Sequence, residues 1–428
     1  MAVATTDERP WLGQWNSAVT SYYTLVGTSS LLLVLGLVMV LSSSTVTSIA
    51  DGASPYSAFL DQAKFAIIGL PTLLVAARIP VRWYKRLAWP ALGVAVVLLV
   101  AVMFMGDLVG GNRNWLRLGP VRFQPSEVAK LALTVWLGAV LGRKQRLLGR
   151  WRHVIWPAVP GVVLVLGLVL AGHDLGTGLI LIALALGAFW VSGAPARLLG
   201  LGGGLAAVII GYVFVYGSSD RMGRIFATYG TCQDVQNECY QSIHGLYALG
   251  SGGVLGLGLG ASREKWRYLP EAHNDFIYAV IGEELGLLGT LMVLGLFVAL
   301  GIAMSRVIRR HPDPFVKVTT AGVACWIVGQ AFVNIGVVIR VIPVIGVPLP
   351  LVSAGGSALV TTMAALGMVI SFARSEPGAA QALAARGSVV RRSLAVLGVQ
   401  RAVAGRPGRR GDQGAGRVTR RWRRAGRR

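Results

Sequence analysis

The sequence predicts an all-α polytopic membrane protein with about ten transmembrane helices and a large extracytoplasmic loop between the seventh and eighth helices. Three observations support this fold class. Apolar residues make up 54% of the 428 residues and charged residues only 14%, whereas soluble domains carry roughly 25% charged residues. Apolar runs of about 20 residues, the length that spans a bilayer, recur along the chain. Basic residues gather in alternate short loops, as the positive-inside rule requires.

Ten apolar runs are the candidate spans. The first is longer than the apolar region of a cleavable signal peptide, so it predicts an uncleaved anchor. The runs predict a cytoplasmic N-terminal segment (1–25), a membrane domain (26–374) that contains the large loop (217–274), and a basic tail (375–428). The candidate spans cover residues 26–45, 62–79, 88–106, 125–142, 154–172, 175–194, 198–216, 275–304, 316–340 and 350–373.

The distribution of Lys and Arg predicts which loops are cytoplasmic. Basic residues gather after the second, fourth, sixth and eighth spans, whereas 46–61 and 341–349 contain none. Because cytoplasmic loops carry the basic excess, we expect both termini to be cytoplasmic. The loop 107–124 is an exception, since Arg113, Arg117 and Arg122 lie on the expected outer side. These charges are either simply solvated or form a site for an anionic ligand.

The C-terminal tail is strongly basic. From residue 376 to the end it contains 14 Arg and 2 acidic residues, which supply +12 of the net charge of +23. Few large apolar residues are present to form a core, so we expect the tail to be disordered. Its charge predicts attraction to anionic lipids. Nucleic-acid binding is not favoured, because no folded nucleic-acid-binding module accompanies the charge.

Two polar motifs lie at the starts of the fourth and sixth spans. Glu127 and Lys130 are three residues apart, on one face of a helix. They form either an ion pair that makes burial tolerable or a site where Lys130 faces a polar cavity and receives an anionic group. Asp174 precedes an apolar run, where a helix N-cap is the structural interpretation. Both motifs are candidates for function, because ionisable groups in membrane segments are costly.

The densest group of acidic and imidazole side chains lies where the large loop enters the eighth span. Glu271, His273 and Asp275 fall within five residues. Capping of the helix by Asn274 or Asp275 is one interpretation, but the density favours acid–base chemistry or cation binding. The prolines and glycines of 343–357 predict a broken helix or re-entrant turn that lines a cavity. The residues alone therefore predict an outward-facing polar cavity, in either a transporter or a membrane enzyme.

The three cysteines form no metal-binding pattern. Cys325 lies in an apolar run and is interpreted as a packing residue. Cys232 and Cys239 both fall in the large loop, on the expected oxidising side. They are a candidate disulfide, and two free thiols are the alternative.

Five stretches together resemble the SEDS family (shape, elongation, division and sporulation). They occur in the family's order over residues 26–373, which is essentially the whole membrane part. The Glu271-Ala272-His273 and Gly282-Glu283-Glu284 variants are similar to the division-type members rather than to the elongation-type members. The stretches are residues 36–44, Gln124 to Glu127 with Lys130, Asp174 to Thr177, Tyr268 to Gly286, and Pro348 to Pro350 with Ser353 to Ser357.

The resemblance implies a peptidoglycan glycosyltransferase that polymerises lipid II with inversion at the outer face of the cytoplasmic membrane. We expect it at the division septum, with an FtsI-type class B penicillin-binding protein and other division proteins as partners. A lipid II flippase or a non-catalytic division scaffold is the alternative. A divalent cation, Mg²⁺ or Mn²⁺, could assist the leaving diphosphate.

The resemblance also implies residue roles. Asp275 matches the family's catalytic aspartate, so we expect it to be the general base. The predicted substrate-binding residues are Arg113, Lys130, Gln241, Glu271, His273 and Ser353. The sequence departs from the family pattern at Asn114, His173 and Arg340, where Arg, Pro and Gly are usual, and in the large loop around 228–239.

Overall fold

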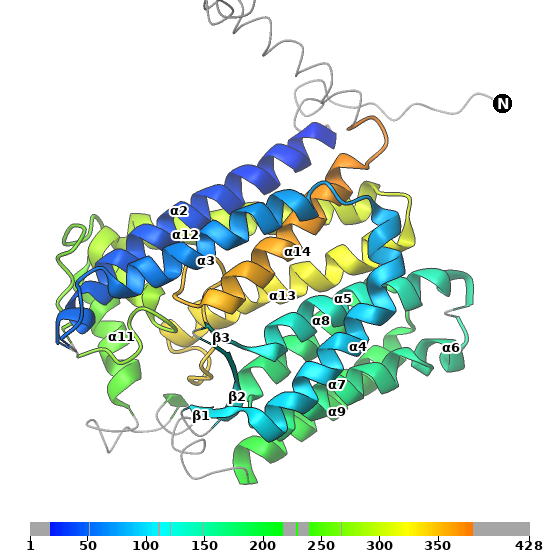
Figure 1. Ribbon diagram of the computed structural model, residues 1–428, viewed down its shortest axis with the longest axis horizontal. Helices are drawn as coiled ribbons and strands as arrows, with labels where there is room; N and C mark the ends of the chain where they lie inside the picture. The colour runs from blue at the N-terminus through cyan, green and yellow to red at the C-terminus, as the bar shows by residue number, and fades with distance from the viewer. Residues whose placement is uncertain are drawn as a thin grey trace, which may run out of the picture. The chain divides into compact units, whose positions relative to one another are not determined.

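The computed structural model describes residues 18–379 apart from 51, 110, 111, 120, 148, 217–227, 230–238 and 267. The predicted tail lies outside the described residues, except for its first few positions. Each of the ten predicted spans coincides with helical structure, and most of these helices run side by side (Figure 1). They are α2 (Ala18–Ala50), α3 (Ser57–Ala76), α4 (Val81–Met105), α5 (Pro125–Arg143), α6 (Trp151–Ile155) with α7 (Ala158–Ala171), α8 (Leu175–Ser192), α9 (Ala196–Tyr216), α12 (Ile277–Arg310), α13 (Pro314–Val338) and α14 (Gly356–Arg374).

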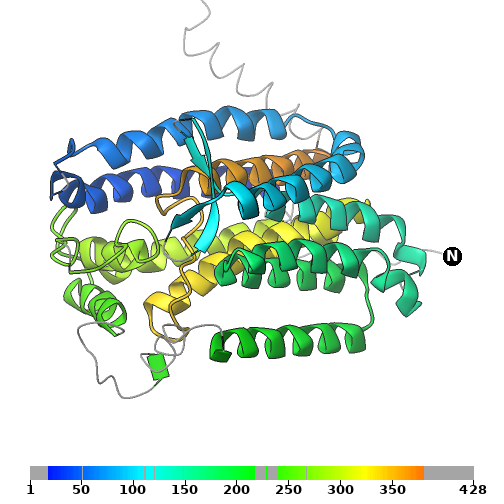
Figure 2. The same cartoon turned by 60° about the horizontal axis from the view of Figure 1, so that its bottom comes forward.

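Eight helical segments in the described part of the chain are long and apolar enough to cross a membrane. The two predicted spans that fall short are α5 and α9. Glu127 and Lys130 lower the hydropathy of α5, although most of this helix is buried. The described apolar part of α9 is shorter than a span. It packs on α8 and lies apart from the other helices (Figure 2). The helical membrane fold predicted from the sequence is confirmed.

Small residues bring the central helices close together. A Cβ atom on Gly138 of α5 would lie 1.9 Å from Oγ1 of Thr319 in α13, and one on Gly322 would lie 2.7 Å from the Thr134 side chain. Such contacts are typical of membrane helices, whose association depends on close van der Waals packing. The helices α5, α8 and α13 therefore form the buried centre, which carries most of the polar side chains discussed below.

The predicted loop 107–124 is a three-stranded antiparallel sheet, which the sequence did not predict. Its strands are β1 (Asp107–Val109), β2 (Asn112–Leu118) and β3 (Val121–Phe123), in the order β1-β2-β3. Arg117 and Arg122 both lie near Asp107, at 3.2 and 3.8 Å. Two of the three exceptional outer arginines therefore share one acidic partner within the sheet.

The segment between α13 and α14 is the predicted interruption. Residues 339–355 are not helical, and Val347, Leu349 and Val352 within them are buried. The last predicted span started too early, at 350, because the proline and glycine residues delay the helix until Gly356. The large loop also contains a helix, α11 (Tyr240–Ser251), that the sequence did not predict.

Candidate functional site

Four helices begin at one end of the bundle and surround a single polar cavity. The cavity has a volume of about 590 Å³, and its walls include the first residues of α5, α8 and α14 together with Asp275, two residues before α12. The rest of the wall comes from β2, the 344–348 segment and the loop before α12. Because the chain reverses at each span, these elements meet at the same end even though they are far apart in sequence.

Four of the seven predicted site residues line this cavity. They are Lys130, Gln241, Glu271 and Asp275. The predicted polar cavity thus exists, and the catalytic candidate lies in its wall. The side chains of Arg113, His273 and Ser353 are not among the lining groups, and their places are described below.

The main chain around Asp275 is held by three donors from neighbouring elements. The Ala354 amide donates to the His273 carbonyl at 3.0 Å, and the Ser353 hydroxyl donates to the Asn274 carbonyl at 2.6 Å. The Asn334 side-chain amide donates to the Asp275 carbonyl at 2.7 Å. Three successive carbonyl groups are therefore fixed, and the Asp275 carboxylate projects from a rigid backbone toward the cavity.

Neither Asn274 nor Asp275 caps α12, so the capping interpretation was wrong. The N-cap position is Phe276, and no side chain among the described residues makes a capping hydrogen bond there. Asn274 instead donates to the Glu271 carboxylate at 2.5 Å. Glu271 has a positive φ of 53°, and this contact within the loop helps to fix the turn that leads into Asp275.

Glu127 and Lys130 form the ion pair that one interpretation of the sequence predicted, and they also line the cavity. The Lys130 ammonium lies 2.8 Å from the Glu127 carboxylate, and both side chains are almost fully buried. The ammonium also donates to the Gln330 side-chain oxygen at 3.1 Å and lies 5.0 Å from the centre of the Trp326 ring. The ion-pair interpretation is confirmed, and Lys130 also faces the cavity that contains Asp275. The binding of an anionic group by Lys130 stays a prediction.

Asp174 is the N-cap of α8, as predicted, and it also connects three elements. Its carboxylate accepts the Thr177 amide at 2.9 Å and the Thr177 hydroxyl at 2.8 Å. It further accepts the side-chain amides of Gln124 at 2.8 Å and Asn114 at 3.2 Å. Asn114, which stands where the family usually has Arg, is thus a neutral donor to this carboxylate.

Arg113 and Ser353 lie around the cavity rather than in its lining, whereas Gln241 is part of the lining. The Arg113 guanidinium is exposed and donates to the Met103 carbonyl at 3.1 Å. Ser353 is buried behind the lining, where it also accepts the Leu349 amide. Gln241 reaches the cavity and donates to the Pro270 carbonyl at 3.2 Å. The substrate-binding roles of these residues stay predictions.

His273 faces a second, smaller cavity of about 290 Å³ beside the ends of α2 and α3. Burial lowers the pKa of His273, although the nearby Glu271 carboxylate partly opposes this effect. The imidazole is therefore neutral at neutral pH, so it does not supply a positive charge next to Asp275.

The described residues do not offer a ready metal site. No group of three or more His, Cys, Asp or Glu side chains that could hold an ion occurs within the described ranges. A divalent cation would depend on phosphate oxygens for most of its ligands. The expected cation stays a prediction. The predicted pair of Cys232 and Cys239 also stays a prediction, because Cys232 lies outside the described residues.

Two polar residues of α13 were missed by the sequence analysis. Gln330 donates to the Pro348 carbonyl at 2.8 Å, and Asn334 bridges the carbonyls of Asp275 and Val347. They are four residues apart, on one face of an apolar helix. The rule that polar groups in membrane segments are functional could have identified them.

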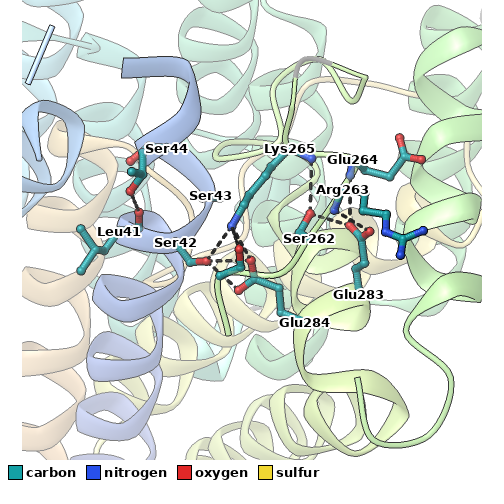
Figure 3. A network of polar contacts seen from close by, with 12 residues as sticks. Leu41, Ser42, Ser43, Ser44, Ser262, Arg263, Glu264, Lys265, Glu283 and Glu284 are labelled. Atoms are coloured by element: carbon teal, nitrogen blue, oxygen red, sulfur yellow. Dashed lines mark hydrogen bonds and ion pairs between the residues drawn. The ribbon is translucent and has the colours of Figure 1, made fainter. Parts of the chain in front are cut away.

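Glu283 and Glu284 do not line the cavity but fasten the large loop to α12 (Figure 3). Glu283 accepts the Ser262 hydroxyl at 2.5 Å and the Arg263 amide at 2.8 Å. Glu284 accepts the Ser42 hydroxyl at 2.7 Å and lies 3.0 Å from the Lys265 ammonium. The motif thus joins α2, α12 and the loop, which is a structural role that the sequence did not reveal.

Comparison with known proteins identifies the family. Residues 23–377 match the family described as "Cell cycle protein", FtsW/RodA/SpoVE. The chain belongs to this family. The matched residues run from within α2 to just beyond α14 and include every residue that lines the cavity. The predicted SEDS resemblance is therefore confirmed.

Several relatives carry the name of the division-type member. Proteins from Mycobacterium tuberculosis and Marinobacter nauticus, each named "Probable peptidoglycan glycosyltransferase FtsW", are 38% identical to this chain. The matches cover 88% and 81% of this chain, and 71% and 87% of those proteins. These names agree with the division-type variants in the motifs.

Solved structures share the fold. A protein from a structure titled "Structural coordination of polymerization and crosslinking by a peptidoglycan synthase complex" superimposes with a TM-score of 0.67 and 26% identity, over 82% of this chain and 97% of that one. Thermus thermophilus rod shape determining protein RodA gives a TM-score of 0.62 and 27% identity, over 83% and 97% of the two chains.

Proposed function

We propose that this protein is a peptidoglycan glycosyltransferase that polymerises lipid II at the outer face of the cytoplasmic membrane during cell division. Asp275 is the general base. The observation that carries the proposal is the fixed Asp275 carboxylate in a polar cavity built from helix N-termini. Membership of the FtsW/RodA/SpoVE family and relatives named peptidoglycan glycosyltransferase support it.

The reaction is a single displacement at a sugar carbon. Asp275 removes the proton from an acceptor sugar hydroxyl, since a hydroxyl is a weak nucleophile at neutral pH. The oxygen then attacks the anomeric carbon of the donor, the bond from that carbon to the diphosphate oxygen breaks, and the configuration inverts. One carboxylate is sufficient, because no covalent sugar–enzyme intermediate has to be formed and hydrolysed.

The leaving diphosphate needs positive potential, and helix N-termini supply it. The first turn of α5 contains Glu127, and the first turn of α8 follows Asp174. Each carboxylate offsets the dipole of its helix. The first turn of α14, Gly356–Leu359, is fully described and carries no acidic side chain. We assign the diphosphate to this helix start, with Lys130 as a cation in the same cavity wall.

The side of the membrane follows from the basic loops. Arg78, Lys85, Arg143 and Arg310 lie at or beyond the helix ends opposite the cavity. Under the positive-inside rule that end is cytoplasmic and the cavity faces outward, where lipid II is consumed. A class B penicillin-binding protein of the FtsI type is the proposed partner, since one structural neighbour comes from a peptidoglycan synthase complex. A divalent cation bound to the diphosphate is proposed as an additional source of positive charge.

Reconstitution distinguishes the three functional classes. The purified protein is placed in vesicles with defined lipid II, with and without the class B penicillin-binding protein, and two products are measured. A glycosyltransferase makes glycan polymer at the cavity side. Robust lipid II translocation without polymer would instead support a flippase, and neither product in the presence of the partner would support a scaffold.

A further inference from the structure

A segment of the large loop exposes a row of apolar side chains. Residues 252–261 contain no charged residue, and four large aliphatic side chains among them are exposed. The exposed fractions are 60% for Val254, 77% for Leu255, 42% for Leu257 and 61% for Leu259. In water this density of exposed leucine would be unfavourable, so the segment needs an apolar surrounding.

The backbone of this segment is paired with a kink in α12. Gly286 has φ 70° and ψ −165°, which interrupts the helix. The Leu257 and Gly258 amides donate to the Glu283 and Glu284 carbonyls at 2.9 and 3.0 Å. In return, the amides of Leu287 and Leu288 donate to the carbonyls of Gly253 and Val254 at 2.9 and 3.3 Å. Non-helical backbone next to lipid is possible only where its polar groups are satisfied in this way.

The paired position lies at the edge of a membrane span. Residues 285–304 of α12 are 20 consecutive residues without a charge, the length that crosses the hydrocarbon. The loop pairs with the first residues of this stretch, and Glu283 and Glu284 lie just beyond it. Leu287, Leu288 and Leu291 of α12 are themselves about half exposed. The apolar surface of the loop is therefore continuous with the lipid-facing surface of a spanning helix.

The residues that follow the segment fit a membrane boundary. Trp266 and Tyr268 are exposed by 63% and 54%, and these residue types are enriched where a bilayer meets water. Lys265 turns inward to Glu284 rather than outward (Figure 3), and its side chain is only 5% exposed. Lys265 is thus removed from the surface beside the apolar segment, whereas Arg263, three residues after Gly260, stays exposed at its edge.

We propose that residues 253–260 form a lipid-inserted loop at the bilayer boundary beside α12, with Val254, Leu255, Leu257 and Leu259 among the acyl chains. The loop is an additional membrane contact at the cavity end of the protein. It lies outside all ten predicted spans. Its occupant is lipid, because its surface continues that of α12 and four of its backbone groups, at Gly253, Val254, Leu257 and Gly258, are hydrogen-bonded to that helix.

The test is a depth measurement in nanodiscs that contain the protein alone. A nitroxide-bearing amino acid is introduced at position 255, and its collisions with oxygen and with a water-soluble nickel chelate are measured by electron paramagnetic resonance. Leu291 is the matched lipid-facing control, and Arg117 of β2, which is exposed and lies outside every predicted span, is the water-facing control. We expect position 255 to match position 291, with frequent oxygen collisions and strongly reduced chelate collisions.

Two results would overturn the proposal. Chelate collisions as frequent as at position 117 would place the loop in water. Loss of collisions with both reagents would show that protein, such as a second copy, covers it. Gly256→Ala provides an independent check, since φ is +80° and the added Cβ would lie 2.2 Å from the Glu284 carbonyl oxygen. This variant should increase the chelate collisions at position 255. Unchanged collision frequencies would contradict the pairing with α12.

Discussion

Two buried lysine–glutamate pairs in this protein have similar geometry but different surroundings. Lys130 and Glu127 are 2.8 Å apart on one helix and lie in the wall of the polar cavity. Lys265 and Glu284 are 3.0 Å apart and join the large loop to α12, with the Glu284 side chain fully buried. All four side chains are almost fully buried, but the first pair borders the polar cavity, whereas the second pair does not.

The comparison shows that a buried ion pair does not identify a function by itself. Removing one partner of an enclosed pair leaves an uncompensated charge, which costs more than the pair contributes. Beside a polar cavity, water or a bound anion can solvate the charge that remains. We therefore assign a fastening role to Lys265 and Glu284, and a substrate-facing role to Lys130. The predictions below test this difference.

Breaking the enclosed pair should have the largest effect. Lys265→Met leaves the buried Glu284 carboxylate with only the Ser42 hydroxyl as a side-chain partner among the described residues. We expect a loss of about 3–5 kcal/mol in the free energy of unfolding, measured as a fall in the thermal unfolding temperature in detergent. The double variant Lys265→Met/Glu284→Met should recover most of the loss. Full stability of the single variant would show that the pair does not fasten the loop.

Breaking the cavity pair should affect activity more than stability. Lys130→Met leaves Glu127 beside the cavity, where water can reach it, so the unfolding temperature should fall less than for Lys265→Met. Polymerisation of lipid II should fall by about 100-fold, the low end for removal of one electrostatic group from an active site. Initial rates with the partner present give the measurement. A variant that polymerises at the normal rate would exclude Lys130 from substrate stabilisation.

Glu376, a buried glutamate without a lysine partner, gives the smallest effect. Glu376 follows α14 at the opposite end, is 3% exposed, and its carboxylate oxygens have no hydrogen-bond partner among the described residues. Burial raises its pKa to about 7, although Arg310 partly opposes this. The folded state therefore holds a proton that the unfolded state releases near pH 4.5. This contribution to stability is present at low pH and is lost as the pH rises through 7.

We expect the protein to lose about 1 kcal/mol between pH 6.5 and 8.5 from this group. Glu376→Gln should remove that slope and be more stable than the unaltered protein at pH 8.5. Unfolding temperatures at the two pH values decide this. His273 and His311, whose pKa values burial lowers from 6.5 in the fold, have the opposite effect, because their unfolded forms still release protons just above pH 6.5. Both proteins share this effect, so the difference between their slopes reports Glu376 alone. An identical slope in both proteins would show that Glu376 is ionised in the fold.

Much of the fold was predictable because hydropathy and charge act locally. Each apolar run became a helix, and Asp174 became an N-cap, because both depend on residues that are close in sequence. The sheet at 107–123 and the helix α11 were not predicted, since short elements between spans carry little periodic signal. The start of α14 at Gly356 was predicted too early, because average hydropathy does not register the proline and glycine residues that delay the helix.

The site was predictable where one motif carried its own chemistry, as at Asp275 and Lys130. It was not predictable where the role depends on a partner far along the chain. Ser353 supports the carbonyl of Asn274, 79 residues away, and Glu284 binds Ser42 across 242 residues. Such contacts are set by tertiary packing, which a single sequence does not display.

The most direct test of the central claim is the polymerisation rate of Asp275→Asn. Two hydrogen bonds that hold this segment, from Asn334 and Ser353, go to the main-chain carbonyls of Asp275 and Asn274, and both survive the substitution. The variant should therefore fold and bind its partner, while the initial rate of polymer formation from lipid II falls by about 100- to 10,000-fold, the usual contribution of a general base. A well-folded Asp275→Asn protein that polymerises lipid II at a near-normal rate would contradict the account.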